Sequence, residues 1–169
     1  MKVFGLAGYS GTGKTTLLVR LLPELTRRGY RVSTIKHAHH TFDVDTPGKD
    51  SYEHRAAGAH EVMVASSNRW ALMHENRGAA EPKLEDLLAR LAAVDLVLIE
   101  GFKRDGHDKI EIVRGPDAPP VLWRDDPHIV AIASDHPVAV PLPQFRVDDI
   151  AAIADFIVTH SRLADRNSR

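Results

Sequence analysis

The chain alternates between apolar blocks and polar segments that contain glycine and proline. Short apolar or alternating runs predict strands, and they occupy residues 3–7, 31–36, 96–99, 110–113 and 129–133. Leucines at 17, 18, 21, 22 and 25 have helical spacing, which predicts a helix from Lys14 to Arg28 that ends before Gly29. Strand, helix and strand of these lengths predict a right-handed parallel crossover, so we expect an α/β fold.

The middle of the chain has a different pattern. Residues 61–65 and 70–73 flank a Ser-Ser-Asn turn and predict a β-hairpin insertion. Asp50 is the predicted N-cap of a short helix. No repeat or internal linker is visible. We therefore predict one nucleotide-binding domain over residues 1–160, with a mostly parallel central sheet and helices on both faces. A polar tail at 161–169 follows it.

A glycine-rich segment, residues 8–15, fits the phosphate-binding pattern G-x-x-x-x-G-K-[ST]. Its glycines let the backbone bend until N–H groups converge on phosphate oxygens, and the following helix adds its positive end. This predicts a P-loop NTPase fold, in which Lys14 bridges the β- and γ-phosphates and Thr15 ligates Mg²⁺. The predicted nucleotide-binding residues here are Gly8, Ser10, Gly11, Thr12, Gly13, Lys14, Thr15 and Thr16.

A P-loop enzyme also needs a carboxylate opposite the loop to hold Mg²⁺ or its waters. Glu100 ends the apolar run 96–99, whereas Asp95 precedes it. About 16 Å of extended strand separates these two acids, so only one can share the ion with Thr15. We predict Thr15 and Glu100 as metal ligands. Lys14, Glu100 and Asp45 are the predicted catalytic residues.

The overall composition and charge argue against nucleic acid or a membrane as the binding partner. The net charge of −1 and pI near 6.8 provide no global basic field for nucleic acid. Cysteine is absent, which excludes disulfides and thiolate metal ligands. No apolar run approaches ~20 residues, and the first residues show no signal-peptide pattern. We expect a cytoplasmic protein with neither a nucleic-acid nor a membrane partner.

Several segments together resemble a known family, MobB, the molybdopterin-guanine dinucleotide biosynthesis accessory proteins. They are GYSGTGKTTL at 8–17, IKHAHHTFDVDTPGKDS at 35–51, HRAAGA at 54–59 and DLVLIEGFKRD at 95–105. The resemblance extends over at least the first two thirds of the chain. Its specific part is the Lys-His-x-His-His…Pro-Gly-Lys-Asp-Ser block, which accompanies a common phosphate-binding loop.

The resemblance implies a P-loop NTPase fold, GTP binding with weak hydrolysis, and a homodimer. With the Mg²⁺ ligands predicted above, this hydrolysis would depend on Mg²⁺. It also implies an accessory role in attaching GMP to molybdopterin or in passing on the guanine dinucleotide. The nucleotidyl transfer itself would belong to a partner, a MobA-type nucleotidyltransferase. A metallochaperone-type GTPase, a small-molecule kinase and a pure binding module are the alternatives that the residues leave open.

Basic residues follow two of the predicted strands. Lys36 ends the second strand, and the histidine-rich loop 37–40 comes next. Lys36 and His37 are predicted to contact phosphate or a pterin-type ligand; a Zn²⁺ or Ni²⁺ site and a merely solvated loop are the alternatives. Lys103 and Arg104 follow Glu100, and we predict a second anionic ligand or a partner there, with ordinary surface charge as the alternative.

Three further residues have two interpretations each. Asp135 ends a strand and would accept both guanine N1–H and N2–H₂, which favours GTP over ATP, or it simply starts a turn. Asp45 either reaches the Mg²⁺ shell or orients the attacking water. Arg55 is predicted as an exposed helical side chain, with phosphate stabilisation in trans across a dimer as the alternative.

Overall fold

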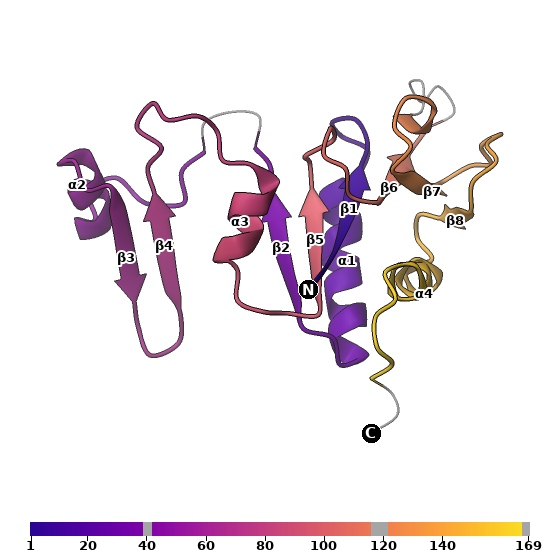
Figure 1. The fold of residues 1–169 in the computed structure, drawn as a ribbon, viewed down its shortest axis with the longest axis horizontal. Helices are drawn as coiled ribbons and strands as arrows, with labels where there is room; N and C mark the ends of the chain where they lie inside the picture. The colour runs from indigo at the N-terminus through magenta and orange to yellow at the C-terminus, as the bar shows by residue number, and fades with distance from the viewer. Residues whose placement is uncertain (39–41, 116–121, 167–169) are drawn as a thin grey trace. The chain divides into compact units, whose positions relative to one another are not determined.

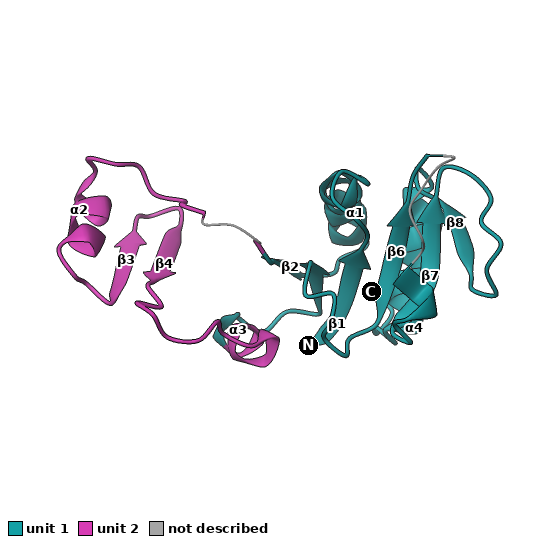
Figure 2. Cartoon of the chain, turned by 90° about the horizontal axis from the view of Figure 1, so that it is seen from above, with its two compact units in different colours: residues 1–37, 90–169 teal, residues 38–89 magenta. Residues whose placement is uncertain are grey.

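The computed structural model describes residues 1–38, 42–115 and 122–166. Its contacts divide the chain into two compact units (Figure 2). The sheet unit comprises residues 1–37 and 90–169, and the hairpin unit comprises residues 38–89. The single domain predicted over residues 1–160 stays a prediction. So does the polar tail, of which residues 167–169 lie outside the described ranges.

Six strands form the sheet of the first unit in the order β2-β5-β1-β6-β7-β8, and all neighbouring pairs are parallel (Figure 1). The strands are β1 (Lys2–Ala7), β2 (Val32–Lys36), β5 (Leu96–Glu100), β6 (Lys109–Val113), β7 (Ile129–Ser134) and β8 (Gln144–Arg146). The predicted α/β fold with a mostly parallel sheet is therefore confirmed. The edge strand β8 was not predicted, because the segment before it is rich in proline. Proline is tolerated at the edge of a sheet because no neighbouring strand needs its missing N–H. The carbonyl of Pro143 still accepts a hydrogen bond from Ile132 N–H at 2.9 Å.

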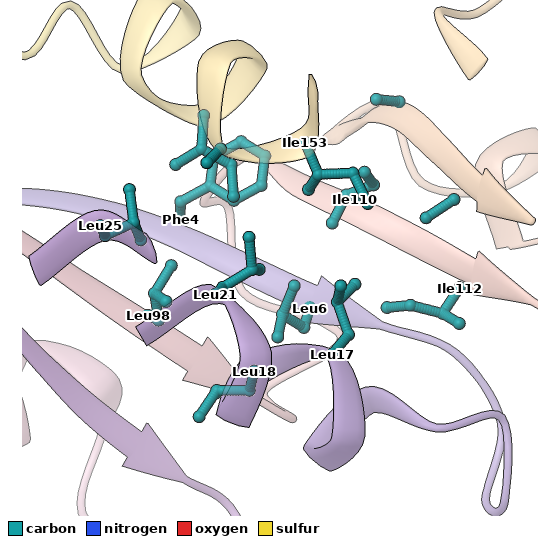
Figure 3. Packing of buried hydrophobic residues seen from close by; sticks show 14 of the residues in the cluster. Phe4, Leu6, Leu17, Leu18, Leu21, Leu25, Leu98, Ile110, Ile112 and Ile153 are labelled. Atoms are coloured by element: carbon teal, nitrogen blue, oxygen red, sulfur yellow. The ribbon is translucent and has the colours of Figure 1, made fainter. Parts of the chain in front are cut away.

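One face of this sheet packs against two helices, α1 (Lys14–Arg27) and α4 (Ile150–His160). The four inward leucines of α1 lie against Phe4 and Leu6 of β1, and Ile153 of α4 closes the cluster (Figure 3). Each such fully buried side chain contributes about 1.5–3 kcal/mol of transfer free energy. The start of α1 is thus fixed against the strand that leads into the glycine-rich loop.

Alternate residues of the same strands form a second cluster on the opposite face. Ala7, Val113, Ile129 and Ile132 lie there with Leu122 and Trp123 of the short 3₁₀ helix η1 (Leu122–Arg124) packed against them. Glu111 is buried on this face, and its carboxylate accepts from the N–H groups of Leu122 and Trp123 at 2.7 and 3.2 Å. Burial raises the pKa of Glu111, and the two backbone donors oppose the shift. The 3₁₀ helix is therefore held to the sheet by a buried acid as well as by apolar contact.

The hairpin unit contains α2 (Asp50–Ala56) and an antiparallel pair, β3 (Glu61–Ala65) and β4 (Trp70–His74). The hairpin insertion is as predicted. Asp50 is not the N-cap of α2, because Lys49 occupies that position with extended backbone angles and Asp50 is the first helical residue. The next helix, α3 (Leu84–Arg90), begins in this unit and ends at the first residue of the sheet unit's second segment. No helix in the described ranges combines the length and apolar character that a membrane span requires.

A half-buried histidine makes the stability of the sheet unit sensitive to pH. Both ring nitrogens of His107 are inaccessible and lack hydrogen-bond partners, and the ring lies against the backbone of Gly5. Burial, followed by the charge of Lys109, lowers the pKa of His107 to about 4. Between pH 6.5 and 4 the unfolded chain therefore binds a proton that the folded chain does not, so stability falls as the pH falls.

We expect wild-type protein to lose roughly 1–2 kcal/mol more unfolding free energy than His107→Phe between pH 7 and 4.5. The expected loss is smaller than the full pKa shift of His107 would give, because its side chain is partly exposed and solvent screens the charge. Urea titrations of both proteins at the two pH values measure the difference. Equal losses in the two proteins would mean that His107 is protonated as readily when folded as when unfolded.

Candidate functional site

The glycine-rich loop connects β1 to α1 at the carboxyl edge of the sheet. Gly8, Gly11 and Gly13 have φ values of 143°, 81° and 90°, which L side chains rarely adopt. A Cβ atom on Gly8 would also lie 2.8 Å from the carbonyl oxygen of Ile112 and 2.8 Å from Thr12 Oγ1. The loop therefore depends on glycine for both its dihedral angles and its close packing on β6.

Lys14 folds back over this loop from the first turn of α1. Its Nζ donates to the carbonyl oxygens of Gly8 and Tyr9 at 3.0 and 2.7 Å, and Thr12 Oγ1 donates to Tyr9 at 2.9 Å. Burial and the charge of Lys103 lower the pKa of Lys14, and Glu100 opposes the shift. The ammonium group is thus held at the mouth of the loop, where cationic neighbours crowd it.

Glu100 lies beside the loop because β5 pairs with β1, with Leu6 and Glu100 in register. Glu100 is buried, with 9% of the residue exposed, and Thr15 Oγ1 donates to its two carboxylate oxygens at 2.8 and 3.0 Å. Asp95 lies at the other end of β5, where it accepts from Arg31 N–H at 2.8 Å. The structure therefore brings together the two residues predicted to share a metal ion.

Two more predicted cations lie at the same edge of the sheet. Lys36 is in register with Glu100 on the neighbouring strand β2, and its Nζ is 3.8 Å from a carboxylate oxygen of Glu100. The Nζ of Lys103 lies 5.5 Å from the ring centroid of Tyr9, in the glycine-rich loop. Lys36, Lys103 and Glu100 all act electrostatically on Lys14, so three lysines and one carboxylate influence this part of the loop. This excess of positive charge suits an anionic ligand.

His37 begins the histidine-rich segment and packs onto the residues that follow β5. Its backbone N–H donates to the Glu100 carbonyl at 2.8 Å, and its ring lies 4.6 Å from that of Phe102. A Cβ atom on Gly101 would lie 2.6 Å from His37 Cβ, so glycine is required at this contact. His39 and His40 lie outside the described residues. Across the residues that are described, no group of three or more His, Asp or Glu is arranged to hold a metal ion.

Asp135 lies just after β7, and its carboxylate already has partners. It accepts from Gly115 N–H at 3.2 Å to each oxygen, and His136 Nδ1 lies 2.7 Å from Oδ1. The hydrogen bonds from His136 and Gly115 lower the pKa of Asp135. Ser10, Gly11 and Thr16 are exposed on the glycine-rich loop and at the start of α1.

Arg55 of the hairpin unit is not the exposed helical side chain that we predicted. Its side chain is 16% exposed, and it binds Asp43 through two hydrogen bonds of 2.7 and 2.9 Å. Glu75 and Asp45 lie 3.0 and 3.5 Å from the same guanidinium. Sequence analysis missed this cluster because the acids come from segments that only the fold brings together.

Asp45 belongs to this cluster as well. Its Oδ1 accepts from Ser51 Oγ at 2.9 Å and from Thr46 N–H at 3.0 Å. The side chain is 9% exposed and faces Arg55. These contacts fix the loop that precedes α2, and the predicted catalytic role of Asp45 stays a prediction.

Comparisons with known proteins agree with this geometry. The family described as "MobB: Molybdopterin guanine dinucleotide synthesis protein B" matches residues 3–135. The chain belongs to the MobB family. Among relatives, a molybdopterin-guanine dinucleotide biosynthesis adapter protein of Escherichia coli (strain K12) is 45% identical over 159 residues, which covers 92% of this chain and 91% of the relative. The protein of the same description from Haemophilus influenzae is 42% identical, over 92% of this chain and 86% of its own length.

Solved MobB structures also share the fold. The crystal structure of Bacillus subtilis MobB matches with a TM-score of 0.76 and 26% identity, over 97% of this chain and 99% of the solved chain. A crystal structure of molybdopterin-guanine biosynthesis protein B matches with a TM-score of 0.75 and 29% identity, over 94% and 99% of the two chains. The resemblance found in the sequence is therefore confirmed as family membership, and the α/β fold is that of MobB.

Proposed function

We propose that this chain is a GTP-binding adapter protein of molybdopterin-guanine dinucleotide biosynthesis, with weak Mg²⁺-dependent GTPase activity. Its MobB relatives carry the adapter description, and the chain covers most of their length. The observation that carries the nucleotide part is the contact of Thr15 with Glu100 beside a glycine loop and Lys14. A hydroxyl, a buried carboxylate and an ammonium group at one sheet edge suit a metal-bound polyphosphate.

The phosphates would lie in the loop of residues 8–13. Backbone N–H groups of the loop and of the start of α1 would donate to phosphate oxygens, and Lys14 would exchange the carbonyl oxygens of Gly8 and Tyr9 for them. Phosphate oxygens are stronger acceptors than carbonyls because they are charged. The half-buried ammonium group of Lys14, which has other lysines nearby, thereby gains a counter-charge.

The oxygen donors of Thr15 and Glu100 fit Mg²⁺, which prefers hydroxyl, carboxylate and water oxygens. The hydroxyl–carboxylate hydrogen bond holds the two side chains where both can face one ion. Bound Mg²⁺ would neutralise charge on the phosphate oxygens. Lys14 would bind the same oxygens from the protein side, and Asp45 is the proposed residue for orienting the attacking water.

The remaining ligands are proposed from charge and from the family. Asp135 would accept guanine N1–H and N2–H₂, in competition with Gly115 and His136. Lys36, His37 and Lys103 would contact molybdopterin or its guanine dinucleotide. A MobA-type nucleotidyltransferase is the proposed protein partner, and a homodimer in the cytoplasm is the proposed assembly.

Calorimetric titration with GTP, ATP and a pterin dinucleotide, with and without Mg²⁺, tests the proposed ligands. We expect GTP to bind more tightly than ATP, and Mg²⁺ to strengthen GTP binding by roughly tenfold. Glu100→Gln should lose most of that Mg²⁺ dependence, because it removes the charged oxygen ligand. The exposed acid Glu85 gives the matched control, Glu85→Gln, which should keep it. Absence of nucleotide binding by wild-type protein would overturn the proposal, and equal affinity for ATP would overturn the role of Asp135.

A further inference from the structure

A second charged residue lies beside the glycine-rich loop, on the side opposite Glu100. The sheet order places β1 between β5 and β6. Both neighbours are parallel to β1, so their carboxyl ends flank the loop that follows it. β5 ends in Glu100, and β6 is followed directly by Arg114. The two flanking strands therefore carry an acid on one side of the loop and a guanidinium on the other.

The guanidinium of Arg114 rests on Gly13, the residue immediately before Lys14. A Cβ atom on Gly13 would lie 3.2 Å from Arg114 Cζ, 3.3 Å from Nε and 3.5 Å from Nη2. The missing side chain at Gly13 is what lets the planar group approach the backbone this closely. Gly13 is the N-cap of α1, so Arg114 lies beside the positive end of this helix, where backbone N–H groups are free to bind phosphate.

Arg114 has no competing partner in the described part of the chain. It is exposed, and no hydrogen bond or ion pair joins its side chain to a described residue. This differs from Arg28 and Arg55, which are both tied to carboxylates. Five N–H donors in a fixed planar arrangement thus stand beside the loop, and that arrangement matches two oxygens of a phosphate group.

We propose that Arg114 is a phosphate-binding residue that contacts the polyphosphate of a nucleoside triphosphate from the β6 side of the loop. The inference rests on the proposed nucleotide function. Under this proposal the residues around the loop have different roles. Thr15 and Glu100 would hold the metal on the β5 side, and Lys14 would bind phosphate at the mouth of the loop. Arg114 would donate to phosphate oxygens from the β6 side of the same chain. Charge-assisted, bidentate contacts of this kind are among the stronger hydrogen bonds in proteins.

Three variants test this role: Arg114→Gln, Arg114→Lys and the control Arg31→Gln. Arg31 is exposed in the same unit, and its backbone lies beside Asp95 at the opposite end of β5. Arg31→Gln removes one positive charge, as Arg114→Gln does, but at a position far from the loop. We expect Arg114→Gln to weaken Mg·GTP binding by at least about tenfold, and Arg114→Lys to weaken it less, since lysine keeps the charge but not the planar pair of donors. Arg31→Gln should bind as wild type does.

The thermal unfolding midpoint of the nucleotide-free protein shows whether Arg114 binds phosphate or only stabilises the loop. We expect it to stay within about 2 °C of wild type in Arg114→Gln, since an exposed side chain contributes little to stability. Wild-type GTP affinity in Arg114→Gln overturns the inference. So does a large loss of thermal midpoint that accompanies the loss of affinity and persists in Arg114→Lys. If wild-type protein itself binds no nucleotide, the proposed function fails instead, and Arg114 is left without a phosphate to bind.

Discussion

Lys14→Ala is expected to weaken Mg·GTP binding by at least about 100-fold, which corresponds to about 2.7 kcal/mol. The ammonium group is the half-buried cation at the mouth of the loop, and its present partners are two neutral carbonyl oxygens. It can transfer to charged phosphate oxygens with a gain in interaction energy. Alanine retains the loop but removes the charge, so isothermal titration with Mg·GTP measures the loss directly.

The same substitution should not destabilise the nucleotide-free protein. Burial and Lys103 lower the pKa of Lys14, which means that the folded state disfavours its charge relative to the unfolded chain. We therefore expect Lys14→Ala to unfold at or above the wild-type temperature without nucleotide. Lys2→Ala, at the exposed start of β1, is the control and should bind GTP normally. Affinity within threefold of wild type in Lys14→Ala would contradict the assigned role of the loop.

The second large effect concerns Asp126, which pairs with a fully buried lysine. Lys109 is 0% exposed, and its Nζ donates to Asp105 O at 2.8 Å and to Asp126 Oδ2 at 3.0 Å. Burial opposes ionisation of Asp126, yet the pKa of Asp126 is lowered by His128 N–H and by Lys109. Asp126→Ala would leave a buried ammonium group without a counter-charge. We expect a loss of about 3 kcal/mol in unfolding free energy, near the low end for broken buried pairs, because 22% of the Asp126 side chain is exposed.

A double variant shows whether the loss in Asp126→Ala comes from the unpaired charge of Lys109 or from the lost packing of the Asp126 side chain. Lys109→Met/Asp126→Ala should regain a substantial part of the loss, because an apolar chain of similar length fills the space without an unpaired charge. Asp125→Ala, at the exposed neighbouring position, should stay within about 0.5 kcal/mol of wild type. Urea denaturation measures all three. A change below about 1 kcal/mol in Asp126→Ala would contradict the expected cost of leaving a buried ammonium group at Lys109 without a counter-charge.

The sheet and the loop were predictable because their signals are local. Apolar runs such as 96–99 have no polar face, and the structure buries every residue of β5. Gly8 and Gly13 could be recognised from spacing alone, since the bend that they form is built from consecutive residues. Glu100 followed from the same reasoning, because it ends the strand that neighbours the loop.

What escaped prediction depends on distant parts of the chain. Residues 109–113 alternate between charged and apolar positions, which is typical of a half-exposed strand, yet the whole strand is buried. β6 lies between β1 and β7. Lys109 and Glu111 each bind a partner from a segment later in the chain, Asp126 and the N–H of Leu122. Arg55 similarly depends on Glu75, and the contact of Arg114 with Gly13 exists only once β6 lies beside β1. Pairings between segments of this kind leave no periodic trace in the sequence.

The pairing of β1 constrains when the site can form during synthesis. β1 is made before the strands it pairs with, because Leu6 is in register with Glu100, and Ala7 with Glu111. A ribosome-bound chain that has not yet reached these positions has a glycine-rich loop with neither of its flanking strands. The hairpin unit, whose β3 and β4 are joined by a short turn, closes over a far shorter stretch of chain. The proposed nucleotide site can therefore be complete only after β5 and β6 have been made, more than ninety residues after the loop itself.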